Sequence, residues 1–474
     1  MVRGFGSAVL ALALLGVSAV VVAQRLELTE DLARVRLVLS TKAASASITV
    51  SGATVASYIA AVNSGPPSAT VSQIGQVLQL SRNVAGQPAE AQFDVVLADV
   101  TPDAAIVWNV ATADPNADAQ LAVYSLADLD RPALVDRFTS TGSAQFKTTT
   151  LVSAPVGLRS TALGPHLVLA HYYPWYTIPT WSDPQMADRP LRLYSTDVQS
   201  DINAAAAMAR AAGIDAWVVS WQGLAGDRFN DRRMRIALDA AAAAGMRACV
   251  YTETYVANPT NDAAAPIDPR TLLDWLTDIV DLYGTHPAYL RLEGRPVIFT
   301  YAASLLAPSV WTEVLARLRS SGRNPLIVGD FSRSLLLGTF DGEYQYSNVF
   351  SSGDALGDLL RAESLRVRTI NLLRPNDRRR VWVASVTPGF DDSHLADRKS
   401  PRVVERADGA VYDDQWAKAI DTGADWIVVT SWNEWWENTE IEPGVRYGST
   451  YLNKTRTSAQ RFKALPRTPP LIGR

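Results

Sequence analysis

From about residue 158 onward, short apolar runs alternate eight times with alanine-rich segments of helical periodicity. The runs predict strands near residues 166–175, 214–221, 247–255, 296–301, 325–330, 342–347, 381–386 and 426–432. Helices are expected between them, near residues 197–212, 232–244, 271–283, 310–321, 355–373 and 413–422. Alternating strands and helices are typical of an α/β fold with a parallel sheet. Eight such units in about 300 residues predict a closed (β/α)8 TIM barrel.

Glycines follow five of the expected helices, where a left-handed residue would end the helix and return the chain to the sheet. They are Gly213, Gly245, Gly284, Gly322 and Gly423. An open doubly wound sheet is the alternative architecture. The first strand, however, runs into the aromatic sequence HYYPWY, residues 171–176, instead of a glycine-rich phosphate loop. The closed barrel is therefore the favoured prediction.

The part of the chain before the barrel has the pattern of β structure. Runs rich in β-branched residues, at 34–39, 47–50, 93–97 and 105–110, are separated by clusters of Gly, Pro, Asn, Asp and Ser. We expect a small all-β, sandwich-like domain of unknown role at residues 27–157, followed by the catalytic domain at residues 160–474. Trp108 lies inside one apolar run, so we interpret it as a core residue rather than a sugar contact.

The first 25 residues carry an export signal. Arg3 precedes an apolar stretch from Gly4 to Ala23, with Val21 and Ala23 at the small-residue positions that a signal peptidase prefers. The segment is interpreted as a signal peptide or as an N-terminal membrane anchor, because its length is close to that of a bilayer span. Both readings predict a secreted or extracytoplasmic protein, with possible membrane association through this segment.

Charge and composition exclude several functions. The formal net charge is −4 and basic residues are scattered, so no nucleic-acid partner is expected. Cys249 is the only cysteine, which excludes an intrachain disulfide and a cysteine-based metal cluster. The four histidines lack the spacing of a metal motif. We therefore predict no cofactor and no metal.

The active site of such a barrel lies at the carboxyl ends of its strands. Those ends are rich in aromatic rings and carboxylates, which suit the C–H faces and hydroxyls of a sugar, so the expected partner is an oligosaccharide or polysaccharide. The strand ends are HYYPWY (171–176), SWQG (220–223), YTETY (251–255), TY (300–301), Asp330, TPGFDD (387–392) and WNEWWE (432–437). The predicted substrate-binding residues are Tyr173, Trp175, Tyr176, Trp221, Glu253, Tyr255, Tyr301, Asn433, Trp435, Trp436 and Glu442.

Glu434 and Glu437 are the strongest catalytic candidates. Glycoside cleavage needs one carboxyl to protonate the leaving oxygen and a second to act as base or nucleophile. Where a strand gives way to a turn or helix, residues three apart lie on one face, roughly 5–6 Å apart. A close pair also raises one pKa, which keeps an acid protonated near neutral pH. Of Glu440 and Glu442, one is interpreted as a sugar-binding or loop-ordering residue, the alternative being a solvated acidic loop.

These motifs together resemble glycoside hydrolase family 99, the family of endo-α-mannosidases and endo-α-mannanases. The residues that carry the resemblance are HYYPWY, GID (213–215) leading to SWQG, YTETY, and SWNEWWE (431–437) followed by TEIEP (439–443). The resemblance extends from about residue 163 to the end of the chain and leaves the β domain unexplained.

The resemblance implies a metal-independent retaining hydrolase that cleaves α-mannosides, or related α-glycans, through a 1,2-anhydro sugar. Glu434 would act as base on the 2-hydroxyl of the substrate, and Glu437 would protonate the leaving oxygen and later activate water. Glu253 matches the family's carboxylate of the third strand, where a substrate contact is expected, with Tyr255 close by.

This sequence departs from the family pattern at two positions. Trp436 stands where the family has histidine, and Asn438 replaces the glycine that follows the second glutamate. Both carboxylates are kept, so the resemblance implies the same type of reaction. The indole of Trp436 alters the shape and hydrogen bonding beside the acid and therefore bears on the identity of the sugar. Two alternative functions are a non-catalytic saccharide-binding envelope protein and a barrel that acts in polysaccharide assembly.

Overall fold

The computed structural model describes the chain as two compact units. The described residues are 33–65, 68–74, 76–81, 86–98, 106–126, 133–148, 165–224, 229–256, 265–330, 339–373, 379–396 and 398–465. One unit contains those of 17–162 and 361–380, and the other contains those of 163–360 and 381–467. The predicted export segment, residues 1–25, lies outside the described residues. The predicted boundaries at 27–157 and 160–474 stay predictions.

The N-terminal part is a β-sandwich of two antiparallel sheets, which confirms the predicted all-β class. One sheet has the order β3-β6-β1-β8-β9 and the other β10-β7-β2-β5-β4. The strands are β1 (Ala33–Thr41), β2 (Ser45–Ser51), β3 (Thr54–Ser64), β4 (Thr70–Ile74), β5 (Val77–Ser81), β6 (Ala89–Ala98), β7 (Ile106–Thr112), β8 (Asp118–Ser125), β9 (Ala133–Thr141) and β10 (Ala144–Thr148).

Alternation of buried and partly exposed residues explains this packing. In β2 every second side chain is buried, as expected for a strand with one face on a core. Leu37, Ile48, Phe93 and Trp108 belong to the shared core of the two sheets. The Trp108 ring nitrogen donates to Thr148 Oγ1 at 2.9 Å, so its interpretation as a core residue is confirmed.

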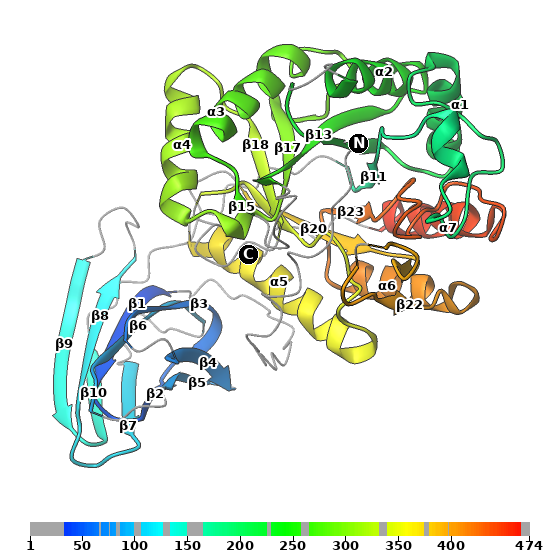
Figure 1. Ribbon diagram of the computed structural model, residues 1–474. Helices are drawn as coiled ribbons and strands as arrows, with labels where there is room; N and C mark the ends of the chain where they lie inside the picture. Colours follow the sequence, from blue (N-terminus) through cyan, green and yellow to red (C-terminus); the bar gives the residue numbers. More distant parts are fainter. Residues whose placement is uncertain are drawn as a thin grey trace. The chain divides into compact units, whose positions relative to one another are not determined.

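The second unit is an eight-stranded parallel barrel, as the sequence predicts (Figure 1). The barrel order is β13-β12-β11-β23-β20-β19-β18-β17, and pairing of β13 with β17 closes it. The strands are β11 (Leu167–Tyr172), β12 (Ala216–Trp221), β13 (Arg247–Glu253), β17 (Arg295–Tyr301), β18 (Leu326–Asp330), β19 (Gly342–Tyr344), β20 (Val381–Val386) and β23 (Trp426–Val429). The closed order excludes the open doubly wound sheet.

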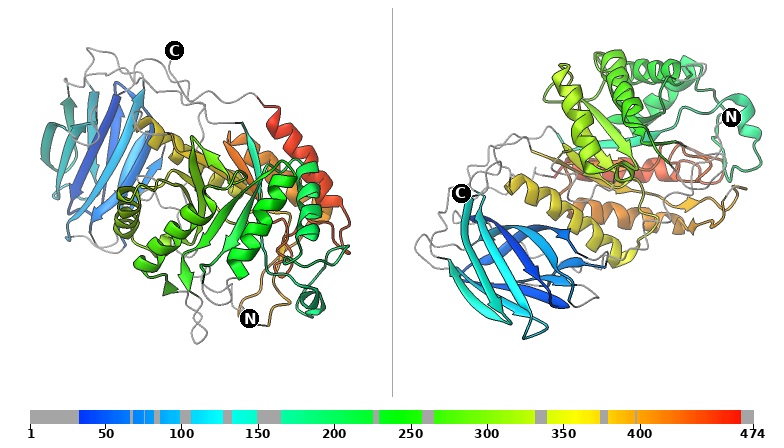
Figure 2. Two further views of the ribbon diagram at one scale, coloured as in Figure 1. Left: turned by 90° about the horizontal axis from the view of Figure 1, so that it is seen from above. Right: turned by 60° about the vertical axis from the view of Figure 1, so that its left-hand side comes forward.

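The helices that belong wholly to the barrel unit lie outside its strands (Figure 2), whereas α5 (Gly353–Leu373) begins in this unit and ends in the other. The helices of the structure follow in chain order. They are α1 (Gln199–Ala211), α2 (Phe229–Ala243), α3 (Pro269–Asp278), α4 (Pro308–Ser320), α5 (Gly353–Leu373), α6 (Ala410–Asp421) and α7 (Thr450–Lys463). The first six confirm the predicted helices, with a π-helical turn, η2 (Ile279–Tyr283), completing the third. No helix is predicted from the sequence at α7. Within the described ranges, no helix combines the length and apolar character that a membrane crossing requires.

Short elements occupy the loops of the barrel. They are η1 (Ile178–Ser182), β14 (Tyr255–Val256), β15 (Ala265–Pro266), β16 (Arg291–Leu292), η3 (Ala303–Leu305), β21 (Phe390–Asp391), β22 (Val403–Val404) and η4 (Ala407–Gly409). The α3 helix shows how loop chemistry fixes an element: the Asp268 side chain accepts hydrogen bonds from the backbone nitrogens of Arg270 and Thr271, with Pro269 in the first turn.

The helix-ending glycines follow the prediction with one exception. Gly213, Gly245, Gly322 and Gly423 all have positive φ, between 63° and 84°. The prediction is wrong for Gly284, whose φ is −57°, because the π-helical turn continues right-handed through it. Glycine is required there for space instead, since a Cβ atom would lie 2.4 Å from the Val280 carbonyl oxygen.

Candidate active site

The segment after β23 forms a tight turn that carries both candidate glutamates. Trp432 N donates to the His171 carbonyl at 2.8 Å, which ties the turn to the end of β11. Ser431 N donates to the Thr439 carbonyl at 2.9 Å, and Glu434 N donates to Ser431 Oγ at 2.7 Å. The strand therefore ends before the pair, so Glu434 and Glu437 do not alternate to opposite faces as strand residues three apart would.

Asn438 ends this turn in the left-handed region, with φ of 50°. Asparagine adopts this conformation more readily than most residues other than glycine. The replacement of the family's glycine by Asn438 therefore keeps the turn.

Glu434 is almost fully buried and has one oxygen without a protein partner. Its side chain is 3 % exposed, and Oε1 accepts from Trp436 N at 3.3 Å. Oε2 is buried and makes no hydrogen bond with the described residues. Burial, and then the charge of Glu437, raise the pKa of Glu434 well above its usual range. The two carboxyl groups are therefore close enough to influence each other.

Glu437 is more open and is held by two donors. Its side chain is 16 % exposed; Arg398 Nη2 lies 3.5 Å from Oε1, and the Tyr346 hydroxyl donates to Oε2 at 3.5 Å. Burial raises the pKa of Glu437 to about 7, and the positive charge of Arg398 opposes this rise. A carboxyl group with this pKa can serve as both acid and base near neutral pH.

Arg398 comes from the loop after β20 and is itself buried, with 6 % of its side chain exposed. Its Nε donates to Asp392 Oδ2 at 2.7 Å. The other Asp392 oxygen accepts from Arg402 N at 2.6 Å. Asp392 thus anchors the loop and aims the guanidinium of Arg398 at Glu437.

Tyr346 connects Glu437 to the end of the first barrel strand and to Asp330 at the end of β18. Its hydroxyl lies 2.5 Å from the hydroxyl of Tyr173. Its backbone nitrogen donates to Asp330 Oδ1 at 3.1 Å, and burial raises the pKa of Asp330 to about 7. Tyr346 follows β19, so the ends of four strands, β11, β18, β19 and β23, meet at this residue.

Glu253 is a third carboxylate at this end of the barrel. It accepts from Ser220 Oγ at 3.2 Å and from Gln222 Nε2 at 3.0 Å, and pairs in register with Tyr301. Its charge raises the pKa values of both Glu434 and Glu437, which places it within electrostatic reach of the pair. Among the described residues, no three His, Cys, Asp or Glu side chains are arranged to hold a metal ion.

Aromatic side chains from the first and eighth strand ends gather beside the pair. Trp436 lies with its ring centroid 5.2 Å from Tyr176 and 6.1 Å from Trp175, and Trp175 lies 4.6 Å from Tyr173. Trp175 and Trp436 are partly exposed, whereas both tyrosines are buried. We call these four residues the aromatic group. Its two indoles can offer flat apolar faces to a sugar.

Asn433 is fully buried and joins the loops that carry the site. It donates to the Tyr173 carbonyl at 2.9 Å and to the Tyr194 hydroxyl at 3.1 Å, and accepts from Tyr173 N at 2.8 Å. Glu442 is also buried and accepts from the Tyr194 hydroxyl at 3.0 Å. Both side chains bind protein groups in the described structure, and their contact with sugar stays a prediction.

Two predicted tryptophans are also enclosed. Trp221 packs against Trp275 and donates to the Tyr283 hydroxyl at 3.2 Å, while Trp435 packs edge-on against Trp181. Neither is exposed. The side chain of Tyr255 lies outside the described part of the structure, which includes only its backbone in β14. The substrate-binding roles of these residues stay predictions.

Three residues of the site were not predicted from the sequence. Tyr346 follows β19, a strand of three residues whose end carries no conspicuous motif. Because active-site residues lie at the ends of barrel strands, the position of Tyr346 after β19 was the signal that could have found it. Asp392 stands in the seventh strand-end motif, without a predicted role. Arg398 lies in a loop, and no local pattern marks it.

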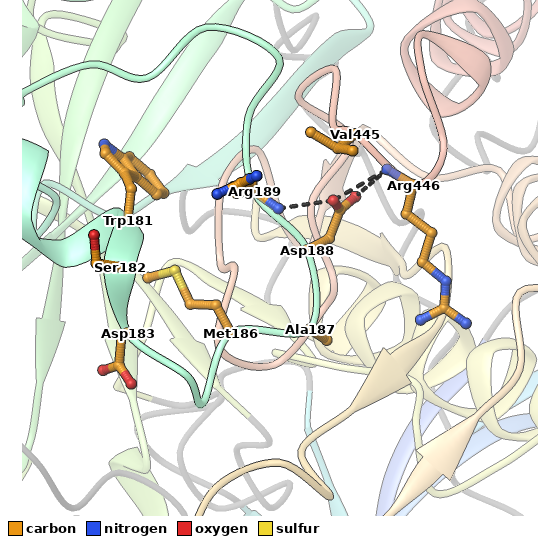
Figure 3. A pocket seen from close by; sticks show the side chains of 9 residues that line it. All are labelled: Trp181, Ser182, Asp183, Met186, Ala187, Asp188, Arg189, Val445 and Arg446. Atoms are coloured by element: carbon orange, nitrogen blue, oxygen red, sulfur yellow. Dashed lines mark hydrogen bonds between the residues drawn. The ribbon is translucent and has the colours of Figure 1, made fainter.

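The barrel unit also has a pocket of about 480 Å³, whose lining side chains are drawn in Figure 3. It is formed by the loops that follow β11 and β23. We call it the rim pocket, and its lining residues are Trp181, Ser182, Asp183, Met186, Ala187, Asp188, Arg189, Val445 and Arg446.

Comparison with known proteins gives one family. The sequence profile of glycosyl hydrolase family 99 matches residues 186–454. Glycoprotein endo-alpha-1,2-mannosidase from Mus musculus is 26 % identical over 215 residues, which cover 39 % of this chain and 45 % of the mouse protein. A glycoprotein endo-alpha-1,2-mannosidase-like protein from Homo sapiens is 25 % identical over 286 residues, covering 53 % of this chain and 59 % of the human one. The chain spans about half the length of these relatives.

A solved structure agrees with these sequence matches. The GH99 endo-alpha-mannosidase from Bacteroides thetaiotaomicron, in complex with BIS-TRIS-propane, superposes with a TM-score of 0.52 and 26 % identity. The superposition covers 62 % of this chain and 97 % of that protein.

Proposed function

This chain belongs to glycosyl hydrolase family 99, and from that premise we propose that it hydrolyses α-mannoside or related α-glycan linkages with retention of configuration. The observation that carries the proposal is a pair of carboxyl groups with different surroundings, of which Glu434 is buried and Glu437 is partly exposed. Glu434 presents an unpartnered oxygen, whereas Glu437 is held by Arg398 and Tyr346. Two carboxyls with distinct environments are what glycoside cleavage requires.

In the first step, Oε2 of Glu434 removes the proton from the 2-hydroxyl of the substrate. The 2-oxygen then forms a bond to the anomeric carbon as the glycosidic bond breaks, and Glu437 gives its proton to the leaving oxygen. The product of this step is a 1,2-anhydro sugar. In the second step, ionised Glu437 takes a proton from water, and the water oxygen attacks the anomeric carbon. The 2-oxygen leaves that carbon and takes back the proton from Glu434.

The protonation state of Glu434 depends on its contacts in the site. Glu434 must be ionised to accept a proton, yet burial raises its pKa well above the usual range. A substrate hydroxyl that donates to Oε2 would favour the ionised form and lower that pKa. The unpartnered oxygen is therefore both the point of attachment for the 2-hydroxyl and the group that such a contact would activate.

Hydrolysis of a panel of α-linked oligosaccharides, mannosides first, tests the proposal. The full chain is compared with Glu434→Gln, Glu437→Gln and the matched control Glu313→Gln, which changes an exposed helix residue. NMR reports the anomeric configuration of the first product. Retention, with activity lost in both site variants and kept in the control, is the expected result. Saccharide binding without turnover on any member would support a non-catalytic binding protein instead.

We also propose that the protein is exported. The support is the apolar segment at residues 4–23 behind Arg3. N-terminal sequencing of the protein recovered from the extracytoplasmic fraction checks this, and recovery in the cytoplasm would contradict it.

A further inference from the structure

The rim pocket has the size of a sugar-binding site. Its volume of about 480 Å³ falls in the range of small-ligand pockets, about 300–1,000 Å³. It lies outside the turn that carries Glu434 and Glu437, and none of its lining residues takes part in the proposed reaction.

The pocket is built before any ligand arrives. Leu191 N donates to the Pro443 carbonyl at 3.0 Å, and Val445 N donates to the Arg189 carbonyl at 2.9 Å, so the two loops pair with each other. The buried carboxylate of Asp188 lies between the backbone nitrogens of Arg189 and Arg446 and accepts from both (Figure 3). A preformed pocket avoids the entropic cost of ordering loops around a ligand.

The lining suits a neutral polyol. Asp183 offers an acceptor, Arg189, Arg446 and Ser182 offer donors, and Met186 contributes an apolar surface. Two carboxylates balance two guanidinium groups, so the pocket has no formal net charge to recruit an ion. A pyranose ring presents hydroxyls and C–H faces together, which such a mixed surface can match.

The pocket is also joined to the catalytic end of the barrel. Trp181, one of its lining residues, stacks on Tyr176 with ring centroids 4.7 Å apart. Tyr176 in turn lies 5.2 Å from Trp436, the neighbour of Glu437 in sequence. Trp181 therefore lines the pocket and at the same time stacks on a member of the aromatic group at the glutamate pair.

We propose that the rim pocket binds a neutral sugar unit of the glycan, remote from the linkage that is cleaved. This inference rests on the proposed function. It extends that function from the glycosidic bond that is cleaved to the length of glycan that the protein recognises. Binding energy from a remote sugar can be used to hold the reacting linkage in place. An oligosaccharide long enough to reach the pocket is then the better substrate.

Filling the pocket tests the proposal. Ser182→Trp places an indole on an exposed lining position, and Ser320→Trp makes the same change on an exposed position of α4, away from the site. Each variant is assayed with an α-linked mannotetraose and with an aryl α-mannoside that carries one sugar. Ser182→Trp should lower kcat/KM for the tetrasaccharide about tenfold or more and leave the aryl mannoside unchanged. Ser320→Trp should change neither.

A second variant removes a donor without adding bulk. Arg446→Ala keeps the backbone nitrogen that binds Asp188. It should also lower kcat/KM for the tetrasaccharide selectively, by about tenfold, which corresponds to the loss of one hydrogen bond to a charged group. Arg456→Ala, on α7, is its control. An equal fall of kcat/KM for both substrates would overturn the proposal. So would an unchanged kcat/KM for the tetrasaccharide in both pocket variants.

Direct binding separates this inference from the catalytic one. Calorimetry measures mannotetraose binding to the full chain carrying Glu434→Gln and Glu437→Gln, with and without Ser182→Trp. Weaker binding when the pocket is filled supports the pocket even if no substrate is turned over. Binding that is indifferent to Ser182→Trp refutes the pocket even if the enzyme is active.

Discussion

Arg398 points its guanidinium at Glu437, with Nη2 3.5 Å from the carboxylate, from a position that is itself buried. The same guanidinium binds Asp392 at 2.7 Å, so it cannot turn away without leaving a buried carboxylate unpaired. This contact distinguishes the two glutamates of the site, because Arg398 makes no hydrogen bond to Glu434 within the described structure.

Arg398→Leu should raise the pKa of Glu437 and thereby move the alkaline limb of the kcat/KM profile to higher pH. Burial already raises this pKa to about 7, and the variant removes the charge that opposes the rise. A shift of about one pH unit or more is expected, since an adjacent opposite charge lowers a carboxyl pKa by about 1–3 units. Arg398→Lys keeps the charge and should shift the limb less. A limb that stays in place in Arg398→Leu would contradict the assignment of Glu437 as the acid.

Tyr346→Phe should lower kcat about tenfold and move the same limb upward. The variant removes the hydroxyl that donates to Glu437 and lies 2.5 Å from the Tyr173 hydroxyl, while keeping the ring. One hydrogen bond to a charged group is worth about 1.5–3 kcal/mol, and 1.4 kcal/mol is a factor of ten. Tyr344→Phe is the matched control, because its hydroxyl donates to the Thr300 carbonyl instead. Equal effects of both variants would indicate a general loss of packing.

Stability should be greatest in acidic solution, at about pH 4, by calorimetric Tm. Burial raises the pKa of Asp330 to about 7 and that of Glu442 to about 8. A raised folded-state pKa gives stability that is complete below the unfolded value, about 4, and is lost progressively as pH rises from there to the folded-state pKa of about 7 to 8. Hydrogen bonding from Arg233 lowers the pKa of Asp197 to about 2, so its contribution is lost below about pH 4.

Glu442→Gln should reduce the fall of Tm with rising pH on the alkaline side. The amide stays neutral at every pH, and its oxygen can still accept from the Tyr194 hydroxyl. The Tm of the variant should therefore fall less between pH 6 and pH 9 than that of the wild-type chain, whereas Glu313→Gln should follow the wild-type curve. Parallel curves for Glu442→Gln and the wild type would show that Glu442 does not titrate in this range.

Asn433→Ala should destabilise the barrel unit by about 2–4 kcal/mol, measured by denaturant unfolding. The side chain makes three buried hydrogen bonds to Tyr173 and Tyr194, and its removal leaves buried groups without partners at about 1–3 kcal/mol each. Asn453→Ala removes an exposed asparagine and should cost less than about 0.5 kcal/mol. A small effect of Asn433→Ala would mean that the loops are held by other contacts.

Much of the barrel could be predicted from local sequence. Runs such as Ala216–Trp221 and Val381–Val386 are apolar except for one serine each, and in the structure all their residues are buried, as expected for parallel strands covered on both faces. The spacing of apolar residues, typical of strands or of helices, therefore predicted the order of these elements. Because the site of a barrel lies at the carboxyl ends of its strands, Tyr173, Glu253 and Glu434 could be predicted to lie close together.

Other features needed the folded chain. Tyr346 could not be singled out, because its strand contributes only three residues to the barrel and its significance comes from Glu437, 91 residues away in sequence. Arg398 reaches the site because Asp392 holds its loop. Trp221 and Trp435 stand near strand ends, where a tryptophan can contact sugar. In the structure, however, their rings pack against other aromatic side chains of the barrel unit.

The sequence by itself determined the order of the eight barrel strands and of the helices α1 to α6, the end of the barrel that carries the site, and the two candidate catalytic carboxyls. These follow from periodicity and residue type, which act over a few residues. The tertiary structure decided which oxygen of Glu434 is left free, that Arg398 and Tyr346 hold Glu437, and that a preformed pocket lies beside Trp181. Hydrogen bonds, burial and pKa values depend on groups that the fold brings together from distant parts of the chain, so no local pattern could specify them.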